Sequence, residues 1–141
     1  GGGIDNAGEF TLHGSVTNNS ATGGAGIFNR GTATLTLKNG SSVADNTASG
    51  DGGGLINEGG TATLESGSAI TRNTAGGDGG GIKMFDGSLI LDAGSSVTEN
   101  DATGVGGGIR AISGSVILDI ASLVANNDPD NCAPAIGTCS S

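Results

Sequence analysis

One short stretch, Gly94-Ser95-Ser96-Val97-Thr98-Glu99-Asn100, decides the fold, because its pattern returns every 27 residues along the chain. An asparagine closes each copy, at Asn19, Asn46, Asn73, Asn100 and Asn127. A β-branched aliphatic residue stands three positions before each asparagine, at Val16, Val43, Ile70, Val97 and Val124. Two columns in one register over five copies predict a repeat architecture in which each copy is one structural unit.

Two further columns lie upstream of these. Six residues before each aliphatic residue stands a large apolar residue, and we expect a second core ladder at Phe10, Leu37, Leu64, Leu91 and Leu118. A glycine followed by an aliphatic residue forms another column, at Gly3-Ile4, Gly26-Ile27, Gly54-Leu55, Gly81-Ile82 and Gly108-Ile109. Its steps are 23, 28, 27 and 27 residues, so small insertions and deletions are expected beside it.

Each repeat has the composition of short strands joined by turns of small residues. In the fourth repeat we expect strands at 88–92 and 96–98, a loop at 101–104, and a third strand at 106–110. The 30 glycines interrupt every window, so we expect no α-helix. The sequence therefore predicts an all-β fold, a single parallel β-solenoid of about five 27-residue coils with three short strands per coil. Residues 1–127 form the repeats, and residues 128–141 form a non-repeating C-terminal tail.

The asparagine column has a physical meaning in a stack of parallel coils. Like residues then lie above one another at about 4.8 Å, and an asparagine amide can donate to one neighbour while it accepts from another. A corner asparagine also tolerates left-handed backbone. The alternative is that asparagine merely suits an exposed turn. We expect an internal ladder, because asparagine alone holds all five copies.

The tail contains both cysteines of the chain, Cys132 and Cys139. Their spacing of seven residues predicts one disulfide that closes a small loop. A disulfide indicates an oxidising, extracellular setting. The alternative is a pair of free thiols.

Charge and hydropathy exclude two classes of partner. The chain carries 14 acidic and 5 basic residues, for a net charge of −9, which repels nucleic-acid phosphates. No apolar run approaches the roughly 20 residues of a transmembrane helix, so we expect no membrane insertion. The only methionine is Met84, so we expect the chain to be a processed or excised piece.

Two segments carry a family resemblance, Gly79-Gly80-Gly81-Ile82 and residues 94–102. They resemble the repeats of polymorphic outer-membrane proteins and related bacterial surface proteins, which read as a glycine block, isoleucine, a strand, and then Ser-x-(Val/Ile)-x-x-Asn-x-Ala. The resemblance covers about residues 1–127. It implies a right-handed parallel β-helix in a secreted or surface-attached protein, many of which are adhesins or autotransporter passengers.

The candidate chemical sites are weak. Glu65, Asp92 and Asp119 form a row headed by Lys38, but each acid directly follows a strand, where a solvated charge is ordinary. We therefore predict no catalytic residue and no cofactor. Calcium near Asp51 and Asp78 stays an open alternative, because their glycine-rich loops are faintly similar to calcium-binding nonapeptide repeats.

The sequence thus favours a non-catalytic extracellular structural protein that forms a surface filament from copies of itself. We expect head-to-tail stacking, because the first coil exposes Ile4, Phe10 and Val16, and the last coil exposes matching columns. One alternative is a fragment of an adhesin or passenger protein that contacts a host or neighbouring cell. Another is a carbohydrate-active or carbohydrate-binding β-helix.

Overall fold

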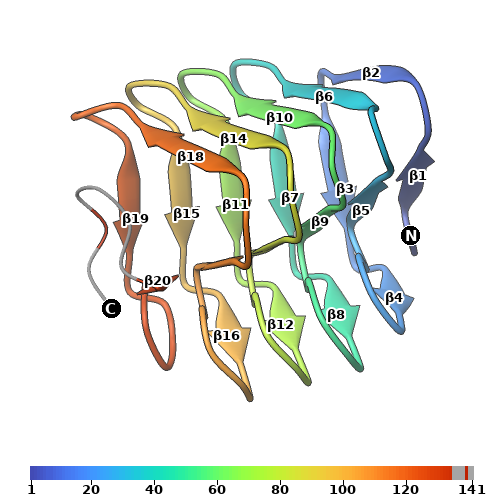
Figure 1. The fold of residues 1–141 in the computed structure, drawn as a ribbon, viewed down its shortest axis with the longest axis vertical. Coiled ribbons are helices and arrows are strands. Elements are labelled where there is room, and N and C mark those ends of the chain that lie inside the picture. The colour runs from blue at the N-terminus through green and yellow to red at the C-terminus, as the bar shows by residue number, and fades with distance from the viewer. Residues whose placement is uncertain (135–138, 140–141) are drawn as a thin grey trace.

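The computed structural model describes residues 1–134 and 139, and over these residues the chain contains only strands, turns and bends. The strands are two to four residues long and wind into a stack of about five coils, with β1 and β20 at opposite ends (Figure 1). Every strand pairing is parallel and joins neighbouring coils, so the predicted β-solenoid is confirmed.

The strands form four sheets along the stack, which we call sheets A to D. Sheet A contains β1 (Ile4–Asn6), β5 (Ile27–Asn29), β9 (Leu55–Asn57), β13 (Ile82–Met84), β17 (Ile109–Ala111) and β20 (Cys132–Ala133). Sheet B contains β2 (Glu9–Leu12), β6 (Thr34–Leu37), β10 (Thr61–Leu64), β14 (Ser88–Leu91) and β18 (Ser115–Leu118). Sheet C contains β3 (Ser15–Thr17), β7 (Ser42–Ala44), β11 (Ala69–Thr71), β15 (Ser96–Thr98) and β19 (Leu123–Ala125). Sheet D contains β4 (Ser20–Ala21), β8 (Thr47–Ala48), β12 (Thr74–Ala75) and β16 (Asp101–Ala102).

Most coils therefore have a fourth, two-residue strand beyond the three that the sequence predicts. In the fourth repeat this strand, β16, lies in the segment expected to be a loop. The third predicted strand also begins later than expected, at Ile109, because Gly106 has a positive φ of 70° and still belongs to the preceding turn.

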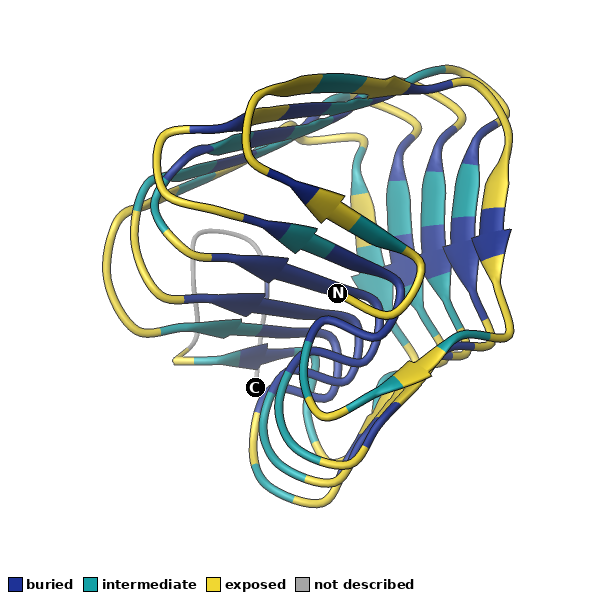
Figure 2. Ribbon diagram, turned by 90° about the vertical axis from the view of Figure 1, so that its right-hand side faces the viewer, coloured by how far each residue is buried: buried dark blue, intermediate teal, exposed yellow. Residues whose placement is uncertain are grey.

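The core consists of columns of aliphatic side chains inside the coils. In sheet C, Ile70 pairs with Val43 on one side and Val97 on the other, as predicted. In sheet B, Leu64 pairs with Leu37 and Leu91. All six of these side chains are fully buried. Figure 2 shows buried positions alternating with less buried ones along many strands, whereas β9 and β13 of sheet A are buried throughout.

One predicted member of the sheet B ladder is wrong. Phe10 pairs with Leu35, and the residue that pairs with Leu37 is Leu12. The reason is a shorter turn in the first coil, because Leu12 lies four residues before Val16 whereas Leu37 lies six residues before Val43. Counting 27 residues back from Leu37 therefore lands two positions too early, on Phe10.

The corner before each ladder asparagine also differs from expectation. The left-handed backbone lies at the residue that precedes each ladder asparagine, at Asn18, Asp45, Arg72, Glu99 and Asn126, with φ between 54° and 58°. The ladder asparagines themselves have ordinary backbone. A positive φ is uncommon in residues with a Cβ. Because it recurs in all five coils, we infer that the next residue, the asparagine whose side chain points inward, sets the backbone conformation of the corner.

The glycine column is packed against this corner. A Cβ on Gly81 would lie 2.7 Å from the carbonyl oxygen of Gly108, 2.8 Å from Nδ2 of Asn100 and 2.9 Å from Cγ1 of Val97. The equivalent glycines Gly26 and Gly54 meet the same kinds of atoms. Glycine is therefore required here by close approach of the asparagine and valine columns.

Candidate functional site

The predicted asparagine ladder runs through the whole stack. The Nδ2 group of each asparagine donates to Oδ1 of the asparagine in the next coil, at 2.9 to 3.0 Å, from Asn19 through Asn46, Asn73 and Asn100 to Asn127. The same Oδ1 atom also accepts the backbone N–H of the preceding asparagine. Asn46, Asn73 and Asn100 are buried. The ladder thus satisfies polar groups inside the core, as buried groups require.

A second, shorter ladder was missed by the sequence reasoning. Asn6 donates from Nδ2 to Oδ1 of Asn29, and Asn29 donates in the same way to Asn57, each over 2.8 Å. It ends at the fourth coil, where Asn57 pairs with the buried Met84. Its signal in the sequence was an aliphatic residue two positions before an asparagine in the first three coils.

A cluster of charges lies on the outer side of sheet A. Nζ of Lys83 donates to Oδ2 of Asp78 over 2.8 Å and lies 3.6 Å from Oδ2 of Asp51. Nε of Arg110 lies 3.8 Å from Oδ2 of Asp78, and Nη1 of Arg110 donates to the carbonyl oxygen of Ala133. The Lys83 side chain is only 4% exposed, whereas Asp78 is 31% exposed, so solvent reaches the carboxylate but hardly the lysine.

This cluster bears on the calcium alternative for Asp51 and Asp78. The ammonium group of Lys83 lies within ion-pair distance of both carboxylates, where a calcium ion would need to bind. The hydrogen bond from Lys83 is the main cause that holds the pKa of Asp78 below its usual value, so this carboxylate is charged at neutral pH. Within residues 1–134 and 139, no three His, Cys, Asp or Glu side chains are grouped to hold a metal ion.

The carboxylate row lies on successive coils, directly after sheet B. The backbone N–H groups of its three residues donate to the leucines that end the sheet B strands of the preceding coil: Glu65 to Leu37, Asp92 to Leu64 and Asp119 to Leu91. Lys38 forms an ion pair with Glu65. All three acidic residues are half-buried or exposed. The row is therefore brought together as the sequence implies, on the outer surface of the solenoid.

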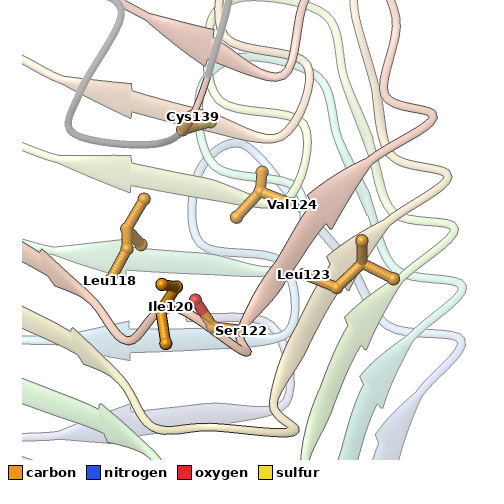
Figure 3. A pocket seen from close by; sticks show the side chains of 6 residues that line it. All are labelled: Leu118, Ile120, Ser122, Leu123, Val124 and Cys139. Carbon is orange, nitrogen blue, oxygen red and sulfur yellow. The ribbon is translucent and has the colours of Figure 1, made fainter.

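Hollows lie at both ends of the core. At the last coil, a hollow of about 250 Å³ is lined by Leu118, Ile120, Ser122, Leu123, Val124 and Cys139 (Figure 3). At the first coil, a hollow of about 380 Å³ is lined by Gly3, Ile4, Leu12, Ser15, Val16, Thr17 and Asn19. Leu12 and Leu118 belong to one core column, and Val16 and Val124 to another. The same columns thus end at both hollows. We expected Ile4, Phe10 and Val16 to be exposed at the first coil, but Ile4 and Phe10 are half-buried and Val16 is buried.

The last coil is also the most apolar part of the described surface. Four large aliphatic side chains of this coil are exposed, Ile112, Ile117, Ile120 and Leu123, and Ile120 is 92% exposed. Phe85 is exposed, whereas Ile56 of β9 is buried. Its side chain is covered by the glycine-rich loops, since a Cβ on Gly23 would lie 3.2 Å from Cδ1 of Ile56.

The predicted disulfide joins Cys132 and Cys139, with a Cα–Cα distance of 5.9 Å. Cys132 pairs with Ile109 in sheet A and is fully buried. Cys139 is 5% exposed and packs with the same core. The remaining tail positions, 135–138 and 140–141, lie outside the described residues.

The fold and these features define the chain as a parallel β-solenoid held together by asparagine ladders. No family model, curated protein or solved structure matches the chain. In the part of the chain that the structure describes, no helix is long and apolar enough to span a membrane.

Proposed function

We propose that this chain is a non-catalytic extracellular structural protein whose solenoid adds end to end to further copies of itself. The observation that carries the proposal is the pair of hollows at the two ends of the core, where the same aliphatic columns end: Leu12 and Val16 are buried at the first coil, and Leu118 and Val124 are half-buried at the last. In the middle of the stack, every such column is covered by the next coil. A second copy supplies the missing neighbour.

The unpaired strand edges support the same conclusion. Within the described residues, β18 pairs only with β14, and β19 pairs only with β15. The strands β2 and β3 likewise pair only with the second coil. Such edges present unpaired N–H and C=O groups that template pairing with another chain. A contact of the last coil with the first coil of a second copy is heterologous and extends without closing.

Three features support the extracellular, non-catalytic part of the proposal. The disulfide is typical of oxidising compartments, and the resemblance of the repeats to those of polymorphic outer-membrane proteins favours a cell-surface setting. Each of the five basic residues is held in an ion pair with an acidic residue, so the charged groups act as ties between coils.

The test uses one charge at each end of the stack. Val16→Asp places a carboxylate in the first-coil hollow, and Val124→Asp places one in the last-coil hollow. Each variant keeps the opposite end intact, so neither extends alone and an equimolar mixture forms dimers that stop at two copies. Thr17→Asp is the matched control, because Thr17 is exposed on the same strand as Val16. Sedimentation velocity and electron microscopy, with and without a dithiol reductant, report the assembly state.

Two outcomes overturn the proposal. The first is a wild-type chain that stays monomeric at high concentration in both redox conditions, which would leave the adhesin-type surface protein as the better hypothesis. The second is dimerisation of the Val124→Asp variant on its own. Its first coils would then pair with each other, and a closed contact between identical surfaces builds no filament.

A further inference from the structure

The tail closes part of the last coil in the way that a sixth coil would. Strand β20 pairs in parallel with β17, with Cys132 opposite Ile109 and Ala133 opposite Arg110. Cys132 thereby continues the buried column of Ile82 and Ile109. In a head-to-tail stack, strand β1 of the second copy belongs at this position on sheet A. Strand β20 and an incoming β1 therefore compete for one edge.

Side chains of the tail also replace hydrogen-bond partners from the missing coil. Asn127 donates from Nδ2 to Oδ1 of Asn131 over 3.0 Å, so the ladder ends on a residue only four positions away. In the coils, the N–H of Gly79 donates to the backbone carbonyl of Val105. The equivalent N–H of Gly106 donates instead to Oδ1 of Asp130, over 2.8 Å. The side chains of Asn131 and Asp130 thus supply hydrogen-bond acceptors to donors at the end of the stack, as a capping segment does.

The disulfide extends this closure to the other side of the core. Its partner Cys139 lines the last-coil hollow together with Leu118 and Val124, which end the columns of sheets B and C (Figure 3). The edges of β18 and β19 have no further strand beside them in the described residues. The bond thus holds a residue over the hollow that a second copy must enter, and it ties that residue to the strand that blocks sheet A.

We propose that the Cys132–Cys139 disulfide controls end-to-end assembly: while the bond is intact, β20 and Cys139 close the last coil, and once it is reduced the coil is open to a second copy. This inference rests on the proposed function, and it adds that the secreted, oxidised chain stays unassembled until a dithiol reduces the bond. Reduction by a dithiol transfers two electrons and two protons to the bond, so that the two cysteines become thiols and the dithiol becomes a cyclic disulfide.

The physical basis is a competition between two partners for the same edge. Once reduced, β20 is held to sheet A by a two-residue pairing, by the hydrogen bond from Arg110 to the Ala133 carbonyl, and by side-chain and backbone bonds of Asp130 and Asn131. An incoming copy offers three residues in β1 and can also pair β2 and β3 with the open edges of β18 and β19. Reduction removes the loop constraint that favours the tail, so displacement of β20 becomes favourable.

The experiment compares assembly of the full chain before and after treatment with dithiothreitol. We expect the apparent dissociation constant for end-to-end addition to fall by at least about tenfold on reduction. The double variant Cys132→Ser/Cys139→Ser should assemble like the reduced chain, and dithiothreitol should not change it. The variant Leu91→Ala, which weakens the middle of the core and keeps the disulfide, should stay as unassembled as the oxidised wild type.

The outcomes separate this inference from the proposed function. Equal assembly of oxidised and reduced chain, or stronger assembly when oxidised, overturns the disulfide control and leaves end-to-end stacking in place. Assembly of oxidised Leu91→Ala also overturns it, because loss of stability alone would then suffice. Absence of assembly in every condition overturns the proposed function and the control with it.

Discussion

The side-chain amide of Asn73 donates to Oδ1 of Asn100 over 3.0 Å, and both residues are buried inside the solenoid. The same Asn73 amide donates to the carbonyl oxygen of Val43 in the preceding coil. One asparagine therefore joins three coils, and its loss should be felt across all of them.

We expect Asn73→Ala to lower the free energy of unfolding by about 3 kcal/mol or more. The substitution removes the acceptor of the Asn46 backbone N–H and one of the two acceptors of its Nδ2 group. The hydrogen bonds from the Asn73 amide to Oδ1 of Asn100 and to the Val43 carbonyl are lost as well. A buried polar group without a partner costs about 1–3 kcal/mol. Asn19→Ala is the comparison, since Asn19 is half-buried at the end of the ladder. Denaturant melts check this, and equal losses at the two positions would contradict a buried, cooperative ladder.

The aliphatic columns give a second prediction. Leu91 is fully buried between Leu64 and Leu118, so Leu91→Ala should cost about 2–4 kcal/mol, as for buried aliphatic residues generally. Thr98 points outward in the neighbouring strand, and Thr98→Ala should change stability by no more than about 0.5 kcal/mol. Similar denaturation midpoints for these two variants would show that the inside and outside of the coils are wrongly assigned.

The glycine column gives a third prediction. Gly81→Ala forces a Cβ to within 2.7 Å of a backbone oxygen and 2.8 Å of Asn100, so this variant should unfold more readily than the wild type. Gly14→Ala is the matched control, because nothing lies within 4 Å of its Cβ, and the lower entropy of the unfolded chain should make it neutral or slightly stabilising. Thermal melts that rank the two variants in the opposite order would refute the packing of the corner.

The charged cluster predicts how stability responds to acid. The pKa of Asp78 is lower in the folded state than in the unfolded state, chiefly because Lys83 donates a hydrogen bond to it. The charged Asp78 therefore stabilises the fold at pH values above its unfolded pKa. That contribution is lost as pH falls below about 4 and through the folded pKa. Asp51, Lys83 and Arg110 are the charged groups that face this carboxylate.

Asp78→Asn and Lys83→Met should therefore both lose less stability than the wild type on acidification. Asp5 and Asp45 also have lowered pKa values, owing to Arg30 and Arg72, and they add the same acid dependence to all three proteins. Chemical denaturation at a series of pH values measures the slopes. If the free energy of unfolding changes with pH in parallel for the three proteins, the Asp78–Lys83 pair contributes nothing to the acid dependence of stability.

The disulfide should stabilise the C-terminal end locally. Mass spectrometry of a non-reduced digest should find Cys132 linked to Cys139 within one chain. Reduction should speed amide hydrogen exchange at Ile109 and Cys132 while Ile70, in the middle of the stack, stays protected. A linkage between chains, or uniform loss of protection along the stack, would contradict a local closure.

Particular residues show how much of this fold a single sequence reveals. The aliphatic column from Val16 to Val124 and the asparagine column from Asn19 to Asn127 are unbroken over five coils. A coil that stacks on similar coils must present the same kind of side chain at each level. Phe10 was misplaced because a turn can shorten by two residues while the strands keep their pairing, and only the backbone hydrogen bonds show where the turn absorbs the difference. The ladder of Asn6, Asn29 and Asn57 escaped notice because it stops after three coils.

The sequence itself determined the 27-residue period, the aliphatic columns, the main asparagine ladder and the disulfide. In a parallel stack, residues that touch in neighbouring coils lie at a regular spacing along the chain, so the spacing reveals the contact. The tertiary structure alone decided the features with no such spacing. Lys83 lies between Asp51 and Asp78 because glycine-rich loops fold back over sheet A. Asn131 takes the place of a sixth ladder asparagine because the tail turns back on the last coil. Both contacts depend on where irregular segments pack, and that is set by the surfaces they cover.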